Sequence, residues 1–574
     1  MLDVVLRGGT VVDGTGAAAW RADVGVRRGL IVAIGDVDEP ASRTVDADGL
    51  VVAPGFIDIH THYDVQVLWD PTVSPSPLHG VTTIVGGNCG FSVAPLEPDD
   101  VDYVMRMMAR VEGMPLDALQ AGPAWDWRSF GEWLGRLDGH LAINAGFLVG
   151  HSTLRRLAMG EAAVGEAATR DQIDRMVGMA HDAMASGALG FSSSLGEAHT
   201  DGDGRPVPSR AARAEEFLAL AGTLRDHAGT SLEFIAAMGE IPQERIELMA
   251  QMSLAANRPL NWNLLGSLSS VEVYQQQLTA CDWATERGAT VKALALPDLL
   301  RMRANSLVET LPGWREVIEL SDGARRSAVH DPRVRQRLRD GLEQAARSGL
   351  QVIGQWDLVE IAESTAPDKT GCTGRTITDV AAERGTEPID VLIDVVLLDQ
   401  LPLTMVFPSL TPSLGASDAG WQVRAKVWKD DRVVLGGSDA GAHLDVMCHA
   451  NYTTVVLGHL VRERALFTLE EAVRELTEVP ARLYGLGRRG RVAEGWHADL
   501  VVFDPERVGS DPAQARCDLP GGASRLYAES RGVEHVLVGG REVVEGGRMT
   551  GELAGTLLRS GVDTETVTVP GGGR

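Results

Sequence analysis

One stretch of the sequence indicates both a fold and a chemistry: Gly55-Phe56-Ile57-Asp58-Ile59-His60-Thr61-His62-Tyr63-Asp64. Residues 56–59 are apolar apart from Asp58 and predict a short buried strand. His60 and His62 follow it, and residues i and i+2 of a strand point to the same face. Two neutral imidazoles that converge at a strand end are a common way to hold a divalent transition metal. A lone His-x-His pair is more often two polar residues at a strand–loop junction, so the metal interpretation depends on the rest of the chain.

The middle of the chain alternates short apolar runs with longer amphipathic stretches. The apolar runs predict strands at residues 81–85, 143–149, 188–192, 231–235, 259–264, 290–294, 351–354 and 433–436. The amphipathic stretches predict helices at residues 170–186, 213–227, 271–288 and 469–476. Repeated strand–helix units across residues 54–480 predict an α/β fold, a (β/α)8 TIM-like barrel. A doubly wound open sheet has the same alternation, but a barrel better explains chemistry at several strand ends.

The two ends of the chain share a different pattern. Residues 1–53 contain short strands separated by glycine turns, and residues 481–556 repeat this pattern. Residues 539–546 (Gly-Gly-Arg-Glu-Val-Val-Glu-Gly) resemble residues 8–14 (Gly-Gly-Thr-Val-Val-Asp-Gly). We therefore predict that the ends pair into one small composite β-sandwich domain. The Gly- and Thr-rich residues 557–574 are expected to form a loose tail.

Residues 296–345 interrupt the alternation. They are charged and helical in pattern, as in Asp331-Pro332-Arg333-Val334-Arg335-Gln336-Arg337-Leu338. A helical insertion between two barrel strands, overhanging the site, explains this pattern, and an enlarged barrel helix explains it equally well.

Composition argues against several classes of protein. The formal net charge is −26, from 53 basic and 79 acidic residues, which argues against nucleic-acid or anionic-membrane partners. The sequence contains no apolar run of about 18 residues that would span a bilayer. Its N-terminus lacks the basic start and apolar stretch of a signal peptide. Five scattered cysteines argue against a disulfide framework, and together these features predict a cytoplasmic protein.

Two further strand ends carry residues suited to a metal site. Cys89 follows the strand at 81–85, and a thiolate there could complete a site with the His-x-His pair. Asp439 follows the strand at 433–436, where a carboxylate could touch the metal and accept a proton from metal-bound water. Taken singly, a lone cysteine is usually a buried small hydrophobe, and Ser-Asp usually caps a turn. Their shared position at strand ends, where barrel active sites lie, favours the metal site.

A series of sequence blocks occurs in a fixed order over most of the chain. They are residues 53–64 (Ala-Pro-Gly-Phe-Ile-Asp-Ile-His-Thr-His-Tyr-Asp), 80–85 (Gly-Val-Thr-Thr-Ile-Val) with 87–90 (Gly-Asn-Cys-Gly), 149–155 (Val-Gly-His-Ser-Thr-Leu-Arg), 186–192 (Ser-Gly-Ala-Leu-Gly-Phe-Ser), 437–439 (Gly-Ser-Asp), 469–473 (Leu-Glu-Glu-Ala-Val), 490–492 (Gly-Arg-Val) and 498–504 (Ala-Asp-Leu-Val-Val-Phe-Asp). With these blocks the chain resembles the amidohydrolase superfamily, and within it the D-aminoacylase (N-acyl-D-amino-acid deacylase) branch. The resemblance implies a metal-bearing barrel, a composite β domain from both termini and an inserted helical segment.

The resemblance also implies roles for individual residues. His60 and His62 match the first-strand metal ligands, and Cys89 matches the ligand that this branch uses in place of a carboxylated lysine. Asp439 matches the last-strand aspartate, which is the general base and acid. Independently of the resemblance, no lysine precedes Lys292, which excludes a carbamylated lysine in the first half of the barrel.

The chain departs from the branch at two strand ends. The branch has histidines at the ends of the fifth and sixth strands, and the corresponding segments here contain none. Glu233 and Asn263 are the nearest polar residues. A carboxylate in an apolar strand is costly without a partner, so Glu233 is a candidate ligand and Asn263 a candidate substrate contact. One Zn²⁺ ion, held by the His-x-His pair, Asp439 and either Cys89 or Glu233, is a simpler expectation than two.

Three other histidines are candidate substrate-binding residues. His151 and His199 each follow a predicted strand, and His199 lies in a Gly-rich segment that could close over a substrate. His443 comes four residues after Asp439 and could orient that carboxylate. A solvated surface role is the competing interpretation for His199 and His443.

These residues predict a zinc-dependent amidohydrolase that cleaves an amide-type C–N bond in a small molecule with an acylated amine. Zinc lowers the pKa of a bound water toward about 7. Asp439 would accept its proton and return it to the leaving nitrogen. By resemblance the substrate is an N-acyl-D-amino acid. Two alternatives stay open: hydrolysis of another amide, cyclic amide or carbamate, and a catalytically weak relative that serves as a binding or scaffold protein. The motifs leave open the acyl group, the stereochemical preference and the oligomeric state.

Overall fold

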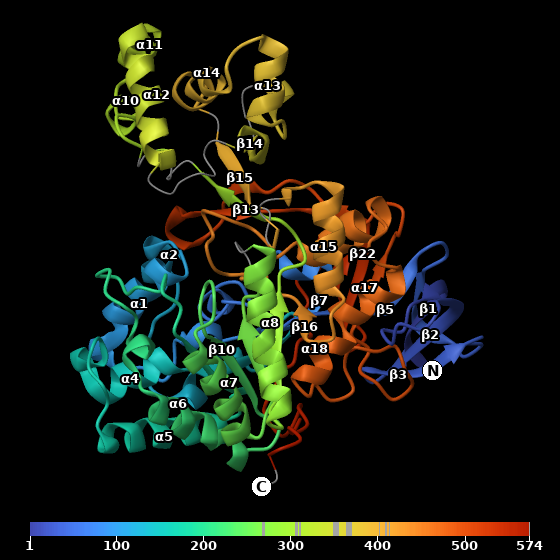
Figure 1. Cartoon of the computed structure of the whole chain (residues 1–574). Helices are drawn as coiled ribbons and strands as arrows, with labels where there is room; N and C mark the ends of the chain where they lie inside the picture. The colour runs from blue at the N-terminus through green and yellow to red at the C-terminus, as the bar shows by residue number, and fades with distance from the viewer. Residues whose placement is uncertain are drawn as a thin grey trace. The chain divides into compact units, whose positions relative to one another are not determined.

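The computed structural model describes the chain apart from residues 267–269, 305–307, 309–310, 348–354, 363–369, 401, 408–409, 412–413 and 573–574. The chain forms two compact units, and Figure 1 colours it from the N- to the C-terminus. Unit 1 comprises Met1–Asp298, Ser409–Leu444 and Cys448–Arg574, and unit 2 comprises Leu299–Pro408 with Asp445–Met447. None of the helices in the described residues combines the length and the hydropathy of a membrane span.

The core of unit 1 is one sheet of eight parallel strands in the order β16-β12-β11-β10-β9-β8-β7-β6. Its strands are β6 (Phe56–Asp58), β7 (Val81–Gly86), β8 (Asn144–Gly150), β9 (Gly190–Ser194), β10 (Ser231–Ile235), β11 (Leu260–Asn263), β12 (Val291–Ala295) and β16 (Val433–Leu435). Each corresponds to a predicted strand. The further strand predicted at residues 351–354 lies outside the described residues.

The sheet is curled, so its first and last strands approach each other. Thr61, just after β6, forms a parallel bridge with Ala440, just after β16. The backbone N–H of His62 donates to the Ala440 carbonyl oxygen at 2.7 Å. The curl is consistent with the predicted TIM-like barrel, whose active sites lie at the carboxyl ends of the strands.

Helices pack against the strands of this sheet. They include α4 (His151–Met159), α5 (Arg170–Ala185), α6 (Ala214–Gly222), α7 (Gln243–Ala256), α8 (Val271–Glu286), α17 (Leu469–Leu476) and α18 (Glu478–Leu483), and Figure 1 shows α4 to α8 beside β10. The start of α5 is fixed by a capping box, because Thr169 and Gln172 exchange side-chain and backbone hydrogen bonds. The predicted helices at 170–186, 271–288 and 469–476 end within two residues of α5, α8 and α17, whereas the one predicted at 213–227 ends earlier, as α6.

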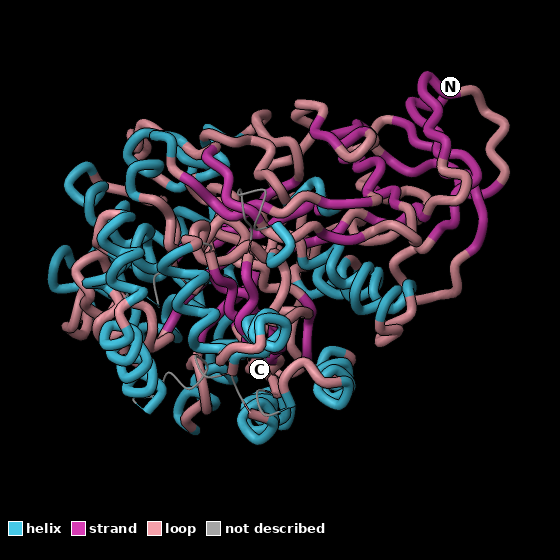
Figure 2. Tube along the Cα trace, turned by 90° about the horizontal axis from the view of Figure 1, so that it is seen from above, coloured by secondary structure: helices cyan, strands magenta, loops and turns pink. Residues whose placement is uncertain are grey.

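Strands from both ends of the chain form a second sheet in unit 1, which Figure 2 shows in magenta near the N-terminus. Its order is β24-β23-β22-β17-β5-β1-β2-β3, and β4 pairs with β1. The strands are β1 (Leu2–Val11), β2 (Trp20–Arg27), β3 (Leu30–Gly35), β4 (Ala41–Asp46), β5 (Val51–Pro54), β17 (Leu500–Phe503), β22 (Val533–Val538), β23 (Arg541–Glu545) and β24 (Arg548–Met549). The two ends join where β17 pairs antiparallel with β5. The predicted pairing of the ends therefore occurs in a single nine-stranded sheet, and the sandwich form stays a prediction.

The end of the chain is packed against the barrel, so the expectation of a loose tail is wrong. Leu557 and Leu558 are 3% and 0% exposed, and Leu558 belongs to the hydrophobic core inside the curled sheet. The Leu558 N–H donates to the Ala145 carbonyl oxygen of β8 at 2.8 Å. Thr564 Oγ1 donates to the Gly229 carbonyl oxygen, just before β10, at 2.7 Å. Two adjacent leucines anchor a segment whose Gly- and Thr-rich composition alone suggests disorder.

Unit 2 lies in sequence between β12 and β16 and has its own core. It contains a three-stranded antiparallel sheet of β13 (Leu300–Arg303), β15 (Leu403–Phe407) and β14 (Val359–Ile361). Its helices include α10 (Arg315–Ile318), α11 (Asp322–His330), α12 (Pro332–Arg347), α13 (Ile377–Arg384) and α14 (Pro388–Ile393). Trp314 and Val329 are fully buried in its core. The sequence predicted a helical insertion at 296–345, and the inserted unit is longer and contains strands.

The substitution Leu558→Ala should destabilise the protein, because it leaves a cavity inside the barrel core. Loss of a fully buried leucine costs about 2–5 kcal/mol. Thermal unfolding followed by circular dichroism measures the effect. Val562→Ala is the matched control, because Val562 lies in the same segment and is 79% exposed. Its effect should stay within about 0.5 kcal/mol. Equal effects of the two substitutions would contradict the packed arrangement.

Candidate metal centre

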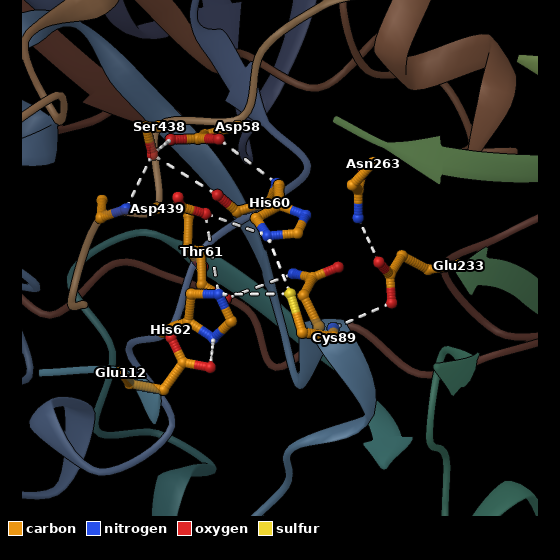
Figure 3. Close-up of polar contacts among 12 residues, drawn as sticks. Asp58, His60, Thr61, His62, Cys89, Glu112, Glu233, Asn263, Ser438 and Asp439 are labelled. Atoms are coloured by element: carbon orange, nitrogen blue, oxygen red, sulfur yellow. Dashed lines mark hydrogen bonds and ion pairs between the residues drawn. The ribbon is translucent and has the colours of Figure 1, made fainter. Parts of the chain in front are cut away.

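Three donor atoms from two neighbouring strand ends converge in unit 1. His60 and His62 follow β6, and Cys89 lies in a short 3-10 turn, Asn88–Gly90, that follows β7. Cys89 Sγ lies 3.4 Å from His60 Nε2 and 3.8 Å from His62 Nε2. The three donors lie within 4.8 Å of one another, and all three residues are buried (Figure 3). Two imidazoles and one thiol at this spacing suit a transition metal such as zinc.

The backbone of the loop after β7 places the thiol. Cys89 has a φ of 59°, in the left-handed region that residues other than glycine rarely adopt. The Asn88 side-chain amide donates to the carbonyl oxygens of Thr61 and Val85, at 3.2 and 2.9 Å, which ties this loop to the histidine segment. Gly87 is required here, because a Cβ atom would lie 2.1 Å from a backbone oxygen of β8. The strained loop is therefore held from both neighbouring strands.

Asp439 brings a fourth donor from the other edge of the sheet. Its Oδ1 lies 3.1 Å from His60 Nε2 and 3.8 Å from His62 Nε2. The loop after β16 is fixed by Ser438, whose hydroxyl donates to the Asp58 carboxylate at 2.5 Å. The Asp439 side chain is 27% exposed, whereas the two histidine side chains are at most 4% exposed. Asp439 is therefore the donor that an entering molecule reaches most easily.

Buried carboxyl groups surround these donors without cationic partners. Asp58, Asp64, Glu112 and Glu233 are each at most 2% exposed. Across the described residues, none of the four forms an ion pair with a lysine or an arginine. The Nδ1 atoms of both donor histidines also have no hydrogen-bond partner. Burying several carboxylates without a cation is costly, so the site fits a divalent metal ion.

Burial perturbs the pKa values of these groups. It raises the pKa of Asp58 to about 7 and that of Glu233 to about 8. Burial and the neighbouring charge of Glu233 raise the pKa of the Cys89 thiol well above its ordinary value. Burial alone would also raise the pKa of Asp439, but the hydrogen bond and charge of His60 hold it below its ordinary value. Asp439 is therefore ionised at neutral pH, as a general base must be.

The structure places Glu233 behind Cys89 and outside the group of donor atoms. Glu233 Oε2 accepts the backbone N–H of Cys89 at 2.9 Å, and the Asn263 amide donates to Glu233 Oε1. Figure 3 shows this pair on the far side of Cys89 from His62. The carboxylate in the apolar strand β10 thus has the partner that its burial requires. The predicted ligand role of Glu233 and the predicted substrate role of Asn263 stay predictions.

Two of the three further histidines lie near the donors. The ring of His199 packs on Phe91 with ring centroids 5.2 Å apart, and its Nδ1 lies 2.9 Å from Ser194 Oγ. Burial and the charge of His443 together lower the pKa of His199 to about 4, although the charge of Asp439 opposes this effect. His199 and His443 are therefore close enough to Asp439 to interact electrostatically. Both are only partly exposed, at the carboxyl ends of the strands.

His151 is not brought to this group. Its Nδ1 lies 2.7 Å from Ser193 Oγ, and its Nε2 lies 2.8 Å from Glu216 Oε1. The residue is fully buried, and Arg155 also pairs with Glu216. Both ring nitrogens are thus used inside the protein, and the structure gives His151 a packing role instead of the predicted contact with substrate.

The sequence interpretation missed Glu112, which lies directly after α1 (Val101–Val111). Its Oε1 lies 3.5 Å from His62 Nδ1. Burial raises the pKa of Glu112 well above its ordinary value. A signal was present, because Glu112 follows Met108 by four residues and so continues the buried face of the helix. An acidic residue on an apolar helix face indicates a special partner.

Comparisons with known proteins identify relatives of this chain and support its fold. The D-aminoacylase of Alcaligenes xylosoxydans xylosoxydans is 32% identical over 569 residues, which cover 97% of each chain. A solved D-aminoacylase structure is 27% identical to this chain, with a TM-score of 0.62, and the match covers 97% of this chain and 100% of that one. That enzyme is described as having a binuclear metal centre with one-metal activation and second-metal attenuation.

A solved N-acyl-D-glutamate deacylase from Bordetella bronchiseptica, in complex with zinc and a phosphonate inhibitor, is 25% identical with a TM-score of 0.62. This match covers 97% of this chain and 99% of that one. The predicted resemblance to the D-aminoacylase branch is thereby confirmed. The sequence also matches the amidohydrolase family over residues 43–544, that is, from within β4 to within β23 of the nine-stranded sheet. This chain belongs to the amidohydrolase family.

Proposed function

We propose that this chain is a metal-dependent hydrolase of amide-type C–N bonds, acting as a deacylase of N-acyl-D-amino acids. One observation carries the proposal: the donor atoms of His60, His62 and Cys89 converge beside the partly exposed carboxylate of Asp439. The similarity to D-aminoacylase and to the N-acyl-D-glutamate deacylase supports the substrate class.

His60, His62, Cys89 and Asp439 would hold the metal. A donor set of two imidazoles, a thiolate and a carboxylate suits Zn²⁺. When bound, zinc activates water at neutral pH and polarises a carbonyl oxygen. Because Asp439 is the donor open to an entering molecule, it also has access to the reacting groups.

Asp439 performs the proton transfers in the proposed reaction. Its ionised carboxylate accepts a proton from the water molecule that attacks the carbonyl carbon of the substrate. It then gives the proton to the nitrogen of the breaking C–N bond, which leaves as a neutral amine. His199 and His443 lie near Asp439 and would contact the polar groups of the substrate.

The Glu233–Asn263 pair favours one metal ion over two. It lies at the ends of β10 and β11, the fifth and sixth strands of the central sheet, where the resemblance implies histidine ligands. One carboxylate oxygen of Glu233 is used by the Cys89 N–H and the other by the Asn263 amide. A carboxylate whose two oxygens both have donors does not need a second ion. The similar D-aminoacylase is itself described as activated by one metal.

The substitution Glu233→Gln should make stability less dependent on pH in protein freed of metal by a chelator. Burial raises the pKa of Glu233 to about 8, whereas a glutamate in the unfolded chain has a pKa of about 4.3. Between these values the folded protein holds a proton that the unfolded chain releases. The contribution of Glu233 to the free energy of unfolding therefore falls as pH rises, by at most about 1.4 kcal/mol per pH unit. As the pH rises from 5 to 9, the unfolding temperature of the wild-type protein should therefore fall relative to that of the variant. A constant difference between the two proteins over this range would contradict the raised pKa of Glu233.

The substitution Asp439→Asn should abolish turnover while the fold is kept. Removing a general base costs about 10²- to 10⁴-fold in rate. Asp431→Asn is the matched control, because Asp431 is exposed and lies before β16 instead of after it. Metal content must be measured on both variants, since Asp439 is also a candidate ligand. Retained turnover in an Asp439→Asn variant would refute its role as the base.

Metal analysis and a substrate panel test the function as a whole. Gently purified protein should contain about one zinc or similar ion per chain, and a chelator should remove both ion and activity. N-acetyl-D-amino acids should be cleaved faster than their L-forms. Cleavage confined to cyclic amides or carbamates would replace the deacylase proposal with another amidohydrolase activity. Absence of bound metal together with absence of turnover would favour a binding or scaffold protein.

A further inference from the structure

The two donor histidines differ in what lies behind their rings. In both, Nε2 faces the donor group, and Nδ1 is buried without a hydrogen-bond partner. Among the described residues, a carboxylate lies close to Nδ1 of His62 but not of His60: Glu112 Oε1 is 3.5 Å from His62 Nδ1, slightly beyond normal hydrogen-bond length. Figure 3 shows the Glu112 carboxylate directed at the ring of His62, on the opposite side from Cys89 and Asp439.

Glu112 is held in place by its own backbone. Its N–H donates to the Met108 carbonyl oxygen at 3.0 Å, which continues the last turn of α1. Its carbonyl oxygen accepts the N–H of His443. Gly113 follows with a φ of 56°, and a Cβ atom there would lie 3.0 Å from the Cα of His443. The segment is therefore fixed between α1 and the loop that carries Asp439.

A carboxylate in this position has a defined chemical use. An imidazole that binds a metal through Nε2 must be neutral and must carry its proton on Nδ1. A buried Nδ1–H needs an acceptor, and a carboxylate acceptor fixes the tautomer, orients the ring and makes Nε2 a stronger donor. Glu112 is 2% exposed and has no lysine or arginine partner in the described part of the chain, so its burial otherwise lacks a reason.

We propose that Glu112 is a positioning residue that accepts the Nδ1–H of His62 and thereby fixes the tautomer and orientation in which His62 binds a divalent metal ion. The inference rests on the metal centre of the proposed function. It adds to the site a residue that directly follows α1, in the segment between β7 and β8 and outside the strand ends that supply the donors.

Zinc titration of chelator-treated protein, in competition with a chromophoric chelator, tests the proposal. Glu112→Gln keeps the shape and an acceptor oxygen but removes the charge, and Glu112→Ala removes the acceptor. The zinc dissociation constant should rise in the order wild type, Gln, Ala. Loss of such a partner typically weakens metal binding by about 10- to 100-fold.

Unfolding temperature without metal separates positioning from packing. Glu112→Gln should leave it unchanged or raised, because an uncompensated buried acid is replaced by a neutral amide. Weaker zinc binding with undiminished stability is the signature of the proposed role. Glu475→Gln is the matched control: Glu475 is a mostly buried carboxylate beside the start of β16, and zinc binding should be unaffected.

The possible outcomes are distinct. If wild-type protein binds zinc and Glu112→Gln binds it within twofold of wild type, the role of Glu112 is refuted while the metal centre stands. If Glu112→Gln loses zinc affinity only in proportion to lost stability, Glu112 is a packing residue. If wild-type protein binds no zinc, manganese or cobalt, the proposed function itself fails.

Discussion

The hydrogen bond from Ser438 to Asp58 helps to join the first and last strands of the curled sheet, and the candidate metal centre depends on that junction. In a flat sheet with strands about 4.8 Å apart, the outer two of eight strands would lie about 34 Å from each other. Here Asp439 Oδ1 lies 3.1 Å from His60 Nε2. Asp58 links the two edges because it accepts both the Ser438 hydroxyl and, at 3.3 Å, the His60 N–H. One buried carboxyl group, together with the backbone hydrogen bond from His62 to Ala440, thus holds the candidate base close to a candidate ligand.

Buried negative charge is the second constraint on this site. Asp58, Asp64, Glu112 and Glu233 are buried around the donors, and in the described residues none is neutralised by a lysine or an arginine. Such an arrangement opposes folding unless protons or a cation compensate for it. A divalent ion bound at the donors would compensate several carboxylates at once. The buried carboxyl groups that would favour metal binding should therefore also make the stability of the metal-free protein depend on pH.

Sequence reasoning located the donors because each follows a strand of the parallel sheet. His60, His62, Cys89 and Asp439 could be expected to converge once a curled parallel sheet was inferred, since such strands end on one side. Glu112 was missed because it follows a helix in a connecting segment, whose packing no strand pattern specifies. The packed chain end was missed for a different reason: its glycines and threonines suggest disorder, whereas its burial depends on Leu557 and Leu558, of which Leu558 fills a space in the barrel core.

Glu233 lies on the fifth strand, β10, where the resemblance implies a histidine, and its hydrogen bond to the Cys89 N–H helps to place the Cys89 thiol. Cys89 has a left-handed backbone conformation, which is unfavourable for any residue with a side chain. Its N–H is directed at Glu233, so the carboxyl group stabilises this conformation, and Asn263 in turn holds that carboxyl group. Two histidines at these positions could bind a second ion but would not supply a carboxyl oxygen to accept the Cys89 N–H. Where the resemblance implies further metal ligands, this chain therefore has hydrogen bonds that hold Cys89, a candidate ligand of a single metal ion.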